Sequence, residues 1–149
     1  MWEYRNSDGF SLIEVLVALV ITALGVLGLV GAHLNAMKFN HIASVRSHAT
    51  FLAYDIADRM RANRRAALFG SYDLALSDTA PSGTAVHEID RRDWLNALAS
   101  QLTDGDGAIA RSNNTFTITV QWDEGRVANT RQTDADGNHR QTFVFVTEL

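Results

Sequence analysis

The stretch that decides the fold runs from Val15 to Ala32 and reads VLVALVITALGVLGLVGA. It carries no charge, and Thr22 is its only polar side chain. As an α-helix it extends about 27 Å, close to the ~30 Å thickness of a bilayer's hydrocarbon core. A secretory signal peptide would have a shorter apolar region and a small-residue cleavage site after it, and none follows here. The stretch therefore predicts a membrane-spanning helix.

The same helix is predicted to continue well beyond the apolar stretch. Between Ala32 and Asn63 the chain has no glycine and no proline. Apolar side chains recur there at spacings of mostly three and four residues, which places them on one face of a helix. They are Leu34, Met37, Ile42, Val45, Ala49, Leu52, Ile56 and Met60. We expect one helix from about Phe10 to about Asn63, apolar all round in its first half and one-sided in its second.

The remainder of the chain begins with a loop and a short helix. Residues 69–88 are rich in Gly, Ser, Thr and Asp and contain the single proline, which is typical of a loop. Asp90 is expected to cap a helix that reaches about Leu102, where the Asp-Gly-Asp-Gly run at 104–107 ends it. This helix would bury one face, formed by Trp94, Leu95, Leu98 and Leu102.

Two alternating patterns near the C-terminus predict β-strands. Residues 115–122 read TFTITVQW, with large apolar side chains at every second position, and residues 140–149 read RQTFVFVTEL. Val127 and its neighbours are a candidate third strand, after a turn at 123–125. Because roughly 80 residues make a marginal core alone, we expect an α+β fold in which this small antiparallel sheet packs on the apolar stripe of the long helix.

Glu14 stands out because it lies where the predicted helix enters the bilayer. A lone carboxylate inside the membrane costs about 2.5–3.5 kcal/mol unless something neutralises it. One interpretation is that Glu14 is an interfacial residue at the level of the headgroups. The other comes from its surroundings. The run Gly9-Phe10-Ser11-Leu12-Ile13-Glu14, after a short polar leader and before an apolar helix, resembles the processing site of type IV prepilins and pseudopilins.

The resemblance implies a set of roles for these residues. A membrane prepilin peptidase would cut after Gly9 on the cytoplasmic side, and the new N-terminal Phe10 would be N-methylated. A glycine at the cut leaves the scissile carbonyl open and allows an extended backbone. Glu14 would pair with the N-terminal ammonium of a neighbouring subunit during assembly, which would neutralise the carboxylate. The leader MWEYRNSDG is less basic than is usual in this family, because Glu3 and Asp8 accompany Arg5.

The implied organisation is that of a type IV pilin-like protein. Residues 1–9 would be the leader, 10–32 the transmembrane half of the long helix, 33–65 its amphipathic half, and 66–149 the globular region. The chain would cross the inner membrane once, with its C-terminal domain in the periplasm, and then enter a pilus filament or its tip.

Further stretches are similar to the minor pilins called type IV pilus modification proteins. These stretches are ADRMRAN at 57–63, the helix around Trp94, and TVQWDE at 119–124. The chain has no cysteine, whereas many major pilins close a C-terminal loop with a disulfide. The implied partners are prepilin peptidase, the inner membrane, other minor pilins and pilus subunits, and a tip adhesin. An I-type minor pseudopilin of type II secretion and a DNA-binding minor pilin remain alternatives.

Charge gives little support to nucleic-acid binding. The net charge is −4, with 13 Lys plus Arg against 17 Asp plus Glu. A basic cluster at the end of the long helix, formed by Arg59, Arg61, Arg64 and Arg65, is compatible with DNA contact. It is also explained by the helix dipole and by ion pairs to Asp55 and Asp58, which we favour. No nucleic-acid partner is expected.

No pattern indicates a catalytic, metal or cofactor site. The five histidines include no pair at i,i+4, and the chain lacks cysteine and the usual nucleophile and phosphate-binding motifs. Residues 134–138 resemble a calcium loop only briefly and are interpreted as a turn. The run Asn113-Asn114-Thr115 fits a glycosylation acceptor in form, and a turn before a strand explains it as well. A structural subunit is favoured over a membrane-anchored binding module or an anchored enzyme, and we expect no catalytic residues, cofactor or metal.

Overall fold

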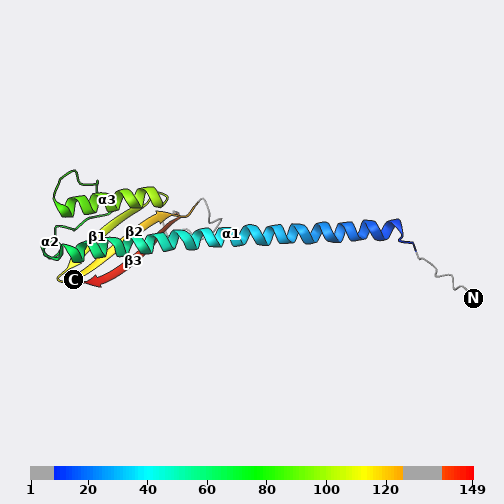
Figure 1. Cartoon of the computed structure of the whole chain (residues 1–149), viewed down its shortest axis with the longest axis horizontal. Helices are drawn as coiled ribbons and strands as arrows, with labels where there is room; N and C mark the ends of the chain where they lie inside the picture. Colours follow the sequence, from blue (N-terminus) through cyan, green and yellow to red (C-terminus); the bar gives the residue numbers. More distant parts are fainter. Residues whose placement is uncertain (1–8, 126–138) are drawn as a thin grey trace, which may run out of the picture. The chain divides into compact units, whose positions relative to one another are not determined.

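The computed structural model describes residues 9–125 and 139–149. Its elements in chain order are α1 (Leu12–Ala62), α2 (Arg64–Leu68), α3 (Val86–Gln101), β1 (Asp106–Ser112), β2 (Thr115–Asp123) and β3 (Arg140–Glu148) (Figure 1). Contacts within the chain define two compact units, with the boundary between Phe39 and Asn40. The fold is α+β, and the single long helix predicted from the sequence is confirmed within two residues at each end.

The first unit consists, in its described part, of the N-terminal portion of α1. Its side chains are exposed, although most are apolar. An 18-residue window of α1 has a mean hydropathy of 2.7, and by length and composition the helix can cross a membrane. In a soluble protein, such apolar side chains would be buried in a core. Their exposure here is consistent with a helix that is surrounded by lipid or by other subunits.

The second unit is built on one face of α1. Its buried α1 residues are Ala49, Leu52, Ala53, Ile56, Ala57 and Met60. The predicted stripe is therefore confirmed from Ala49 onward, and two alanines widen it. Ile42 and Val45 are only partly buried, and the expected positions Leu34 and Met37 are exposed. The stripe was extended too far toward the N-terminus because periodicity alone does not tell which part of a helix has a partner.

The sheet has the order β1-β2-β3, and both pairings are antiparallel. Ile118 of β2 lies between Ile109 of β1 and Phe145 of β3. The alternation predicted for β2 is confirmed, because its four apolar side chains are buried: Phe116, Ile118, Val120 and Trp122. The predicted C-terminal strand is confirmed as β3, whereas the candidate strand around Val127 lies outside the described residues.

Trp94 of α3 joins the helices to the sheet. Its side chain is fully buried, and its indole N–H donates to the main-chain oxygen of Leu52 in α1 at 2.9 Å. A Cβ placed on Gly107 in β1 would lie 2.4 Å from an atom of the Trp94 ring and 2.7 Å from Cδ1 of Leu98. Glycine at this position therefore lets β1 approach α3. Leu95, Leu98 and Leu102 are also buried, as predicted.

Two local predictions need correction. The helix α3 begins at Val86 rather than Asp90, because Glu88 accepts a hydrogen bond from the Ala85 N–H at 3.1 Å and closes the first turn. Asp90 instead accepts hydrogen bonds from side chains of other elements. The run at 104–107 was expected only to end the helix, but its last two residues are the first two of β1, which begins at Asp106.

The packing predicts which part of the chain folds independently of a membrane. A chain that starts near Leu34 retains every buried residue of α1 and should be a soluble monomer that unfolds cooperatively. A chain that starts near Ala66 lacks that face and should not fold. Size-exclusion chromatography and thermal unfolding check both statements, and cooperative unfolding of the shorter chain would show that α1 is not needed for the core.

Gly107→Ala should destabilise the second unit by about 1–3 kcal/mol, because the new methyl group overlaps the Trp94 ring. Gly25→Ala is the matched control, since no described atom lies within 4 Å of its Cβ position. Thermal unfolding of the full chain in detergent, followed by tryptophan fluorescence, measures the difference. Equal midpoints for the two variants would contradict the packing assigned to Gly107.

Candidate processing and assembly site

The residues predicted to be processed precede the first turn of α1. Gly9 and Phe10 lie outside the helix, and Phe10 is 84% exposed. Ser11 caps the helix, because its Oγ accepts a hydrogen bond from the Glu14 N–H at 3.3 Å and its carbonyl oxygen accepts from the same N–H at 3.1 Å. Ser-x-x-Glu is a recognised start signal, so the capping role of Ser11 was available from the sequence.

Glu14 lies in the first helical turn, where a negative charge is favoured by the helix dipole. Within residues 9–125 and 139–149, its carboxylate has no hydrogen-bond or ion-pair partner. It borders a hollow of about 490 Å³ whose other lining residues are Phe10, Val15, Ala18, Leu19 and Thr22. The Thr22 hydroxyl donates its hydrogen bond to the Ala18 carbonyl oxygen at 2.7 Å and therefore does not donate one to the Glu14 carboxylate. The described chain therefore does not neutralise Glu14.

Comparison with known proteins agrees with this arrangement. Residues 4–30 match the family described as the prokaryotic N-terminal methylation motif, and this segment includes Gly9, Phe10 and Glu14. The match supports a membrane-anchored protein of the type IV pilin-like or pseudopilin class, whose members are structural subunits processed by prepilin peptidase. No curated protein and no solved structure gives a significant match.

Three arginines of the basic cluster, Arg59, Arg61 and Arg64, form side-chain contacts within the second unit. Arg59 Nε lies 2.9 Å from Asp55 Oδ2, and Arg61 Nη1 lies 2.6 Å from Asp58 Oδ1. The predicted ion-pair face is thus confirmed. Arg61 also donates to the Thr147 hydroxyl at 2.7 Å, and Arg64 donates to the main-chain oxygen of Leu149 at 2.8 Å. These contacts hold the end of β3 against the helix.

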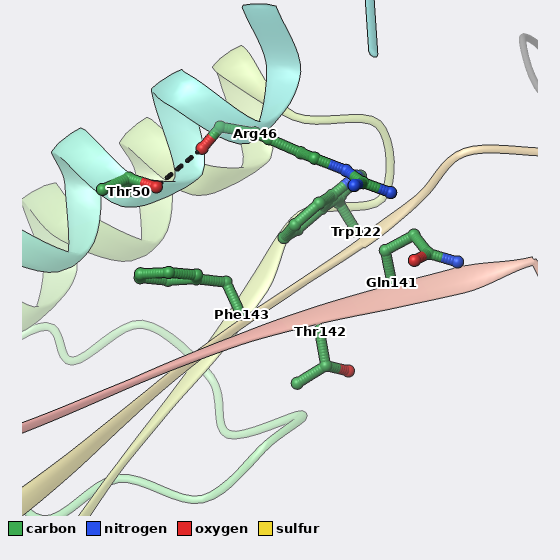
Figure 2. A pocket seen from close by; sticks show the side chains of 6 residues that line it. All are labelled: Arg46, Thr50, Trp122, Gln141, Thr142 and Phe143. Atoms are coloured by element: carbon green, nitrogen blue, oxygen red, sulfur yellow. Dashed lines mark hydrogen bonds between the residues drawn. The ribbon is translucent and has the colours of Figure 1, made fainter. Parts of the chain in front are cut away.

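A second hollow lies between α1 and the start of β3 (Figure 2). It measures about 390 Å³ and is lined by Arg46, Thr50, Trp122, Gln141, Thr142 and Phe143. Beside it, the buried carboxylate of Glu124 accepts from the Trp122 indole N–H at 3.1 Å and from Arg46 Nε at 3.4 Å. Because the side chain is buried and its Oε1 accepts both hydrogen bonds, we interpret Glu124 as a structural group.

The buried Tyr72 joins a partly buried polar network that sequence reasoning missed. Its hydroxyl donates to Asp90 Oδ2 at 2.5 Å and accepts from Asn63 Nδ2 at 3.3 Å, and Arg59 Nη1 lies 3.4 Å from Asp90 Oδ1. Burial, followed by the hydrogen bond to Asp90, raises the pKa of Tyr72 to about 12. The network joins the end of α1, the loop after α2 and the first turns of α3, and no local pattern signals such a meeting.

Other residues considered from the sequence carry no site in the described chain. Asn113 and Asn114 form the two-residue turn between β1 and β2, which was one of the two interpretations of this run, with Asn113 at φ +57°. Among the described residues, no group of three or more His, Asp or Glu side chains is placed to hold a metal ion. Residues 134–138, predicted to be a turn, lie outside the described residues.

The Tyr72 network predicts a dependence of stability on alkaline pH. Since folding raises the pKa of Tyr72 from about 10 to about 12, its contribution to stability is complete below pH 10 and is lost as the pH rises through 12. Ultraviolet absorbance of the phenolate should show a tyrosine that ionises near pH 12 and disappears in Tyr72→Phe. A titration curve identical in the two proteins would contradict the assignment.

Proposed function

We propose that this chain is a type IV prepilin, cut after Gly9, whose mature form is a minor pilin of the PilV type. It would act as a structural subunit that helps to prime pilus assembly. The observation that carries the proposal is a carboxylate at Glu14 that has no partner among the described residues and lies beside an exposed Gly9-Phe10 junction at the start of an apolar helix. The match to the methylation motif supports the same conclusion for residues 4–30.

The local geometry suits cleavage at this junction. Gly9 and Phe10 are exposed, and no described atom lies within 4 Å of a Cβ built on Gly9, so a peptidase can approach the bond from several sides. The hydrogen bonds of the first turn begin at Ser11. Removal of residues 1–9 therefore leaves the helix cap intact and creates a free amine one residue before it.

The charge balance suits assembly through Glu14. Mature subunits would each bring one ammonium at Phe10 and one carboxylate at Glu14 into an apolar environment. Each charge alone is costly there, and a pair is much less so. Since the described chain offers Glu14 no partner, the ammonium of a neighbouring subunit is the partner we propose. A group without any such partner would only oppose insertion.

The proposed setting follows from these roles. The chain would cross the inner membrane once, with residues 10–32 in the bilayer and the second unit in the periplasm, and would then enter the filament or its tip. Its partners would be prepilin peptidase, other minor pilins and pilus subunits, and a tip adhesin. An I-type pseudopilin would share the processing site, and recovery with a secretion pseudopilus instead of pili would identify that alternative.

Substitutions at Gly9 and Glu14 test the proposal in the native host. Wild-type protein should have methylated Phe10 as its N-terminus by mass spectrometry, and Gly9→Leu should retain the leader. Glu14→Gln should be inserted and cleaved but absent from sheared filaments, because loss of the pair costs about 3–5 kcal/mol. Glu14→Asp should rescue recovery in part, since it restores the charge on a shorter side chain.

Thr22→Val is the matched control, because it changes the same hollow without changing charge. It should be processed and recovered like the wild type. An intact Met1 terminus in the wild type would refute the prepilin assignment. Wild-type recovery of Glu14→Gln in filaments would instead refute the pairing and support an interfacial role for Glu14.

A further inference from the structure

The segment directly after the apolar stretch is unusual in its charge. No Asp or Glu occurs between Glu14 and Asp55. Lys38 is the first formally charged residue in this interval, and it is the only lysine of the chain, since all other members of the 13 Lys plus Arg are arginines. Its side chain is exposed, as are those of all residues from His33 to Phe39. The segment therefore presents a positive charge that has no negative charge near it in the sequence.

Lys38 is within reach of lipid headgroups when residues 15–32 span the hydrocarbon core. It follows Ala32, the last residue of the apolar stretch, by six residues, which is about 9 Å of helix. Side chains of a helix lean toward its N-terminus, and on α1 this direction leads back toward the apolar stretch. The headgroup layer on each side of the core is about 5–8 Å thick. The long stem of Lys38 can therefore bring the ammonium into that layer.

Asn35 lies beside Lys38 on the same face of α1, because residues three apart are neighbours on a helix. The Asn35 carboxamide and the Lys38 ammonium both donate hydrogen bonds. Within residues 9–125 and 139–149, no hydrogen bond or ion pair engages either side chain. Two outward-facing donors on one turn suit a ligand with anionic oxygens, and the phosphate of a phospholipid is such a ligand.

Neither helix stabilisation nor membrane topology explains this lysine. Near the end of α1, Arg59 pairs with Asp55 and Arg61 pairs with Asp58, whereas Lys38 has no acidic residue within one turn on either side. In the proposed orientation Lys38 also lies on the periplasmic side, although membrane proteins carry their excess of Lys and Arg on the cytoplasmic side. This last step rests on the proposed function.

We propose that Lys38 and Asn35 bind the headgroup of an anionic phospholipid in the leaflet where α1 leaves the bilayer. The ammonium would pair with the lipid phosphate, and the carboxamide would donate to a phosphate or glycerol oxygen. Two features favour a lipid as the partner. The positive charge complements an anionic headgroup, and the segment continues directly from the membrane-spanning stretch. The contact would hold α1 at a fixed depth and would have to break when a subunit leaves the bilayer.

The lipid selectivity of the full chain tests the proposal. Spin-labelled phosphatidylglycerol and phosphatidylcholine are compared for association with the chain in phosphatidylcholine vesicles at low salt, because the two lipids share a phosphate and differ in net charge. The wild type should prefer phosphatidylglycerol. Lys38→Gln should lower this preference about two- to fivefold, the factor expected from one lysine beside anionic lipid. High salt should also lower the wild-type preference, since it screens the charge.

Lys38→Arg and Arg46→Gln are the matched controls. Lys38→Arg keeps the charge and should retain the wild-type preference. Arg46→Gln removes a charge eight residues farther along α1, about 12 Å more distant from the apolar stretch, where Arg46 Nε lies 3.4 Å from Glu124 Oε1. This variant should retain the preference as well. Equal preference in the wild type and Lys38→Gln, or an equal loss in Arg46→Gln, would overturn the proposal.

A depth measurement locates the segment relative to the bilayer. Because the chain has no cysteine, a single nitroxide can be attached at Ala36→Cys, which leaves Asn35 and Lys38 in place. Its accessibility to an aqueous nickel complex should lie between those of labels at Leu24→Cys, within the apolar stretch, and at Ser100→Cys, on the exposed surface of α3. A label at position 36 as accessible as the label at position 100 would place the segment in water and overturn the proposal.

An acidic side chain of another subunit is the competing partner for Lys38. An unchanged lipid preference in Lys38→Gln, together with loss of this variant from sheared filaments, would assign Lys38 to such a subunit and overturn the lipid contact. The vesicle measurement does not depend on leader processing. A preference shown by a chain that retains Met1 in its native host would leave the lipid contact intact and refute only the prepilin role, whereas no preference in a processed chain would refute only the lipid contact.

Discussion

The apolar face that α1 presents between Ala49 and Met60 is the surface on which the second unit is built. Alanine at 49, 53 and 57 keeps this face shallow, so α3 approaches closely enough for Trp94 to donate a hydrogen bond to the backbone of α1. The Trp94 ring also occupies the space beside β1 where a Cβ of residue 107 would lie, which is why β1 has a glycine there. The helix α3 and the sheet therefore pack on one face of α1, although both lie well beyond it in the sequence.

The elements that the sequence predicted well are those with a strong local period. The long helix and β2 repeat their apolar residues without interruption, and both were found nearly where expected. β1 was missed because DGAIARS has little β propensity, and its conformation is decided by contacts with β2 and α3. The start of α3 was misplaced because Asp90 resembles a cap, whereas its carboxylate accepts hydrogen bonds from Tyr72 and Arg59.

For the candidate site too, the residues could be found from a local motif, whereas their surroundings could be found only from the structure. Gly9, Phe10 and Glu14 were selected from a short motif, and their roles in cleavage and assembly remain predictions. What the structure adds is a contrast between the two units. In the second unit, the buried Glu124 and the partly buried Asp90 each accept two hydrogen bonds from side chains, while Glu14 in the first unit has no described partner. That contrast could not be read from the motif.

The fastening of β3 has a consequence for how this chain matures. Its last residues are held by Arg61, Arg64 and Asn114, through hydrogen bonds instead of a covalent bridge, and the chain contains no cysteine. Such bonds form as the sheet forms and require no oxidant. The second unit therefore reaches its native state without thiol oxidation or disulfide isomerisation, and neither the redox poise of its compartment nor the supply of oxidoreductases limits how fast the subunit is ready for use.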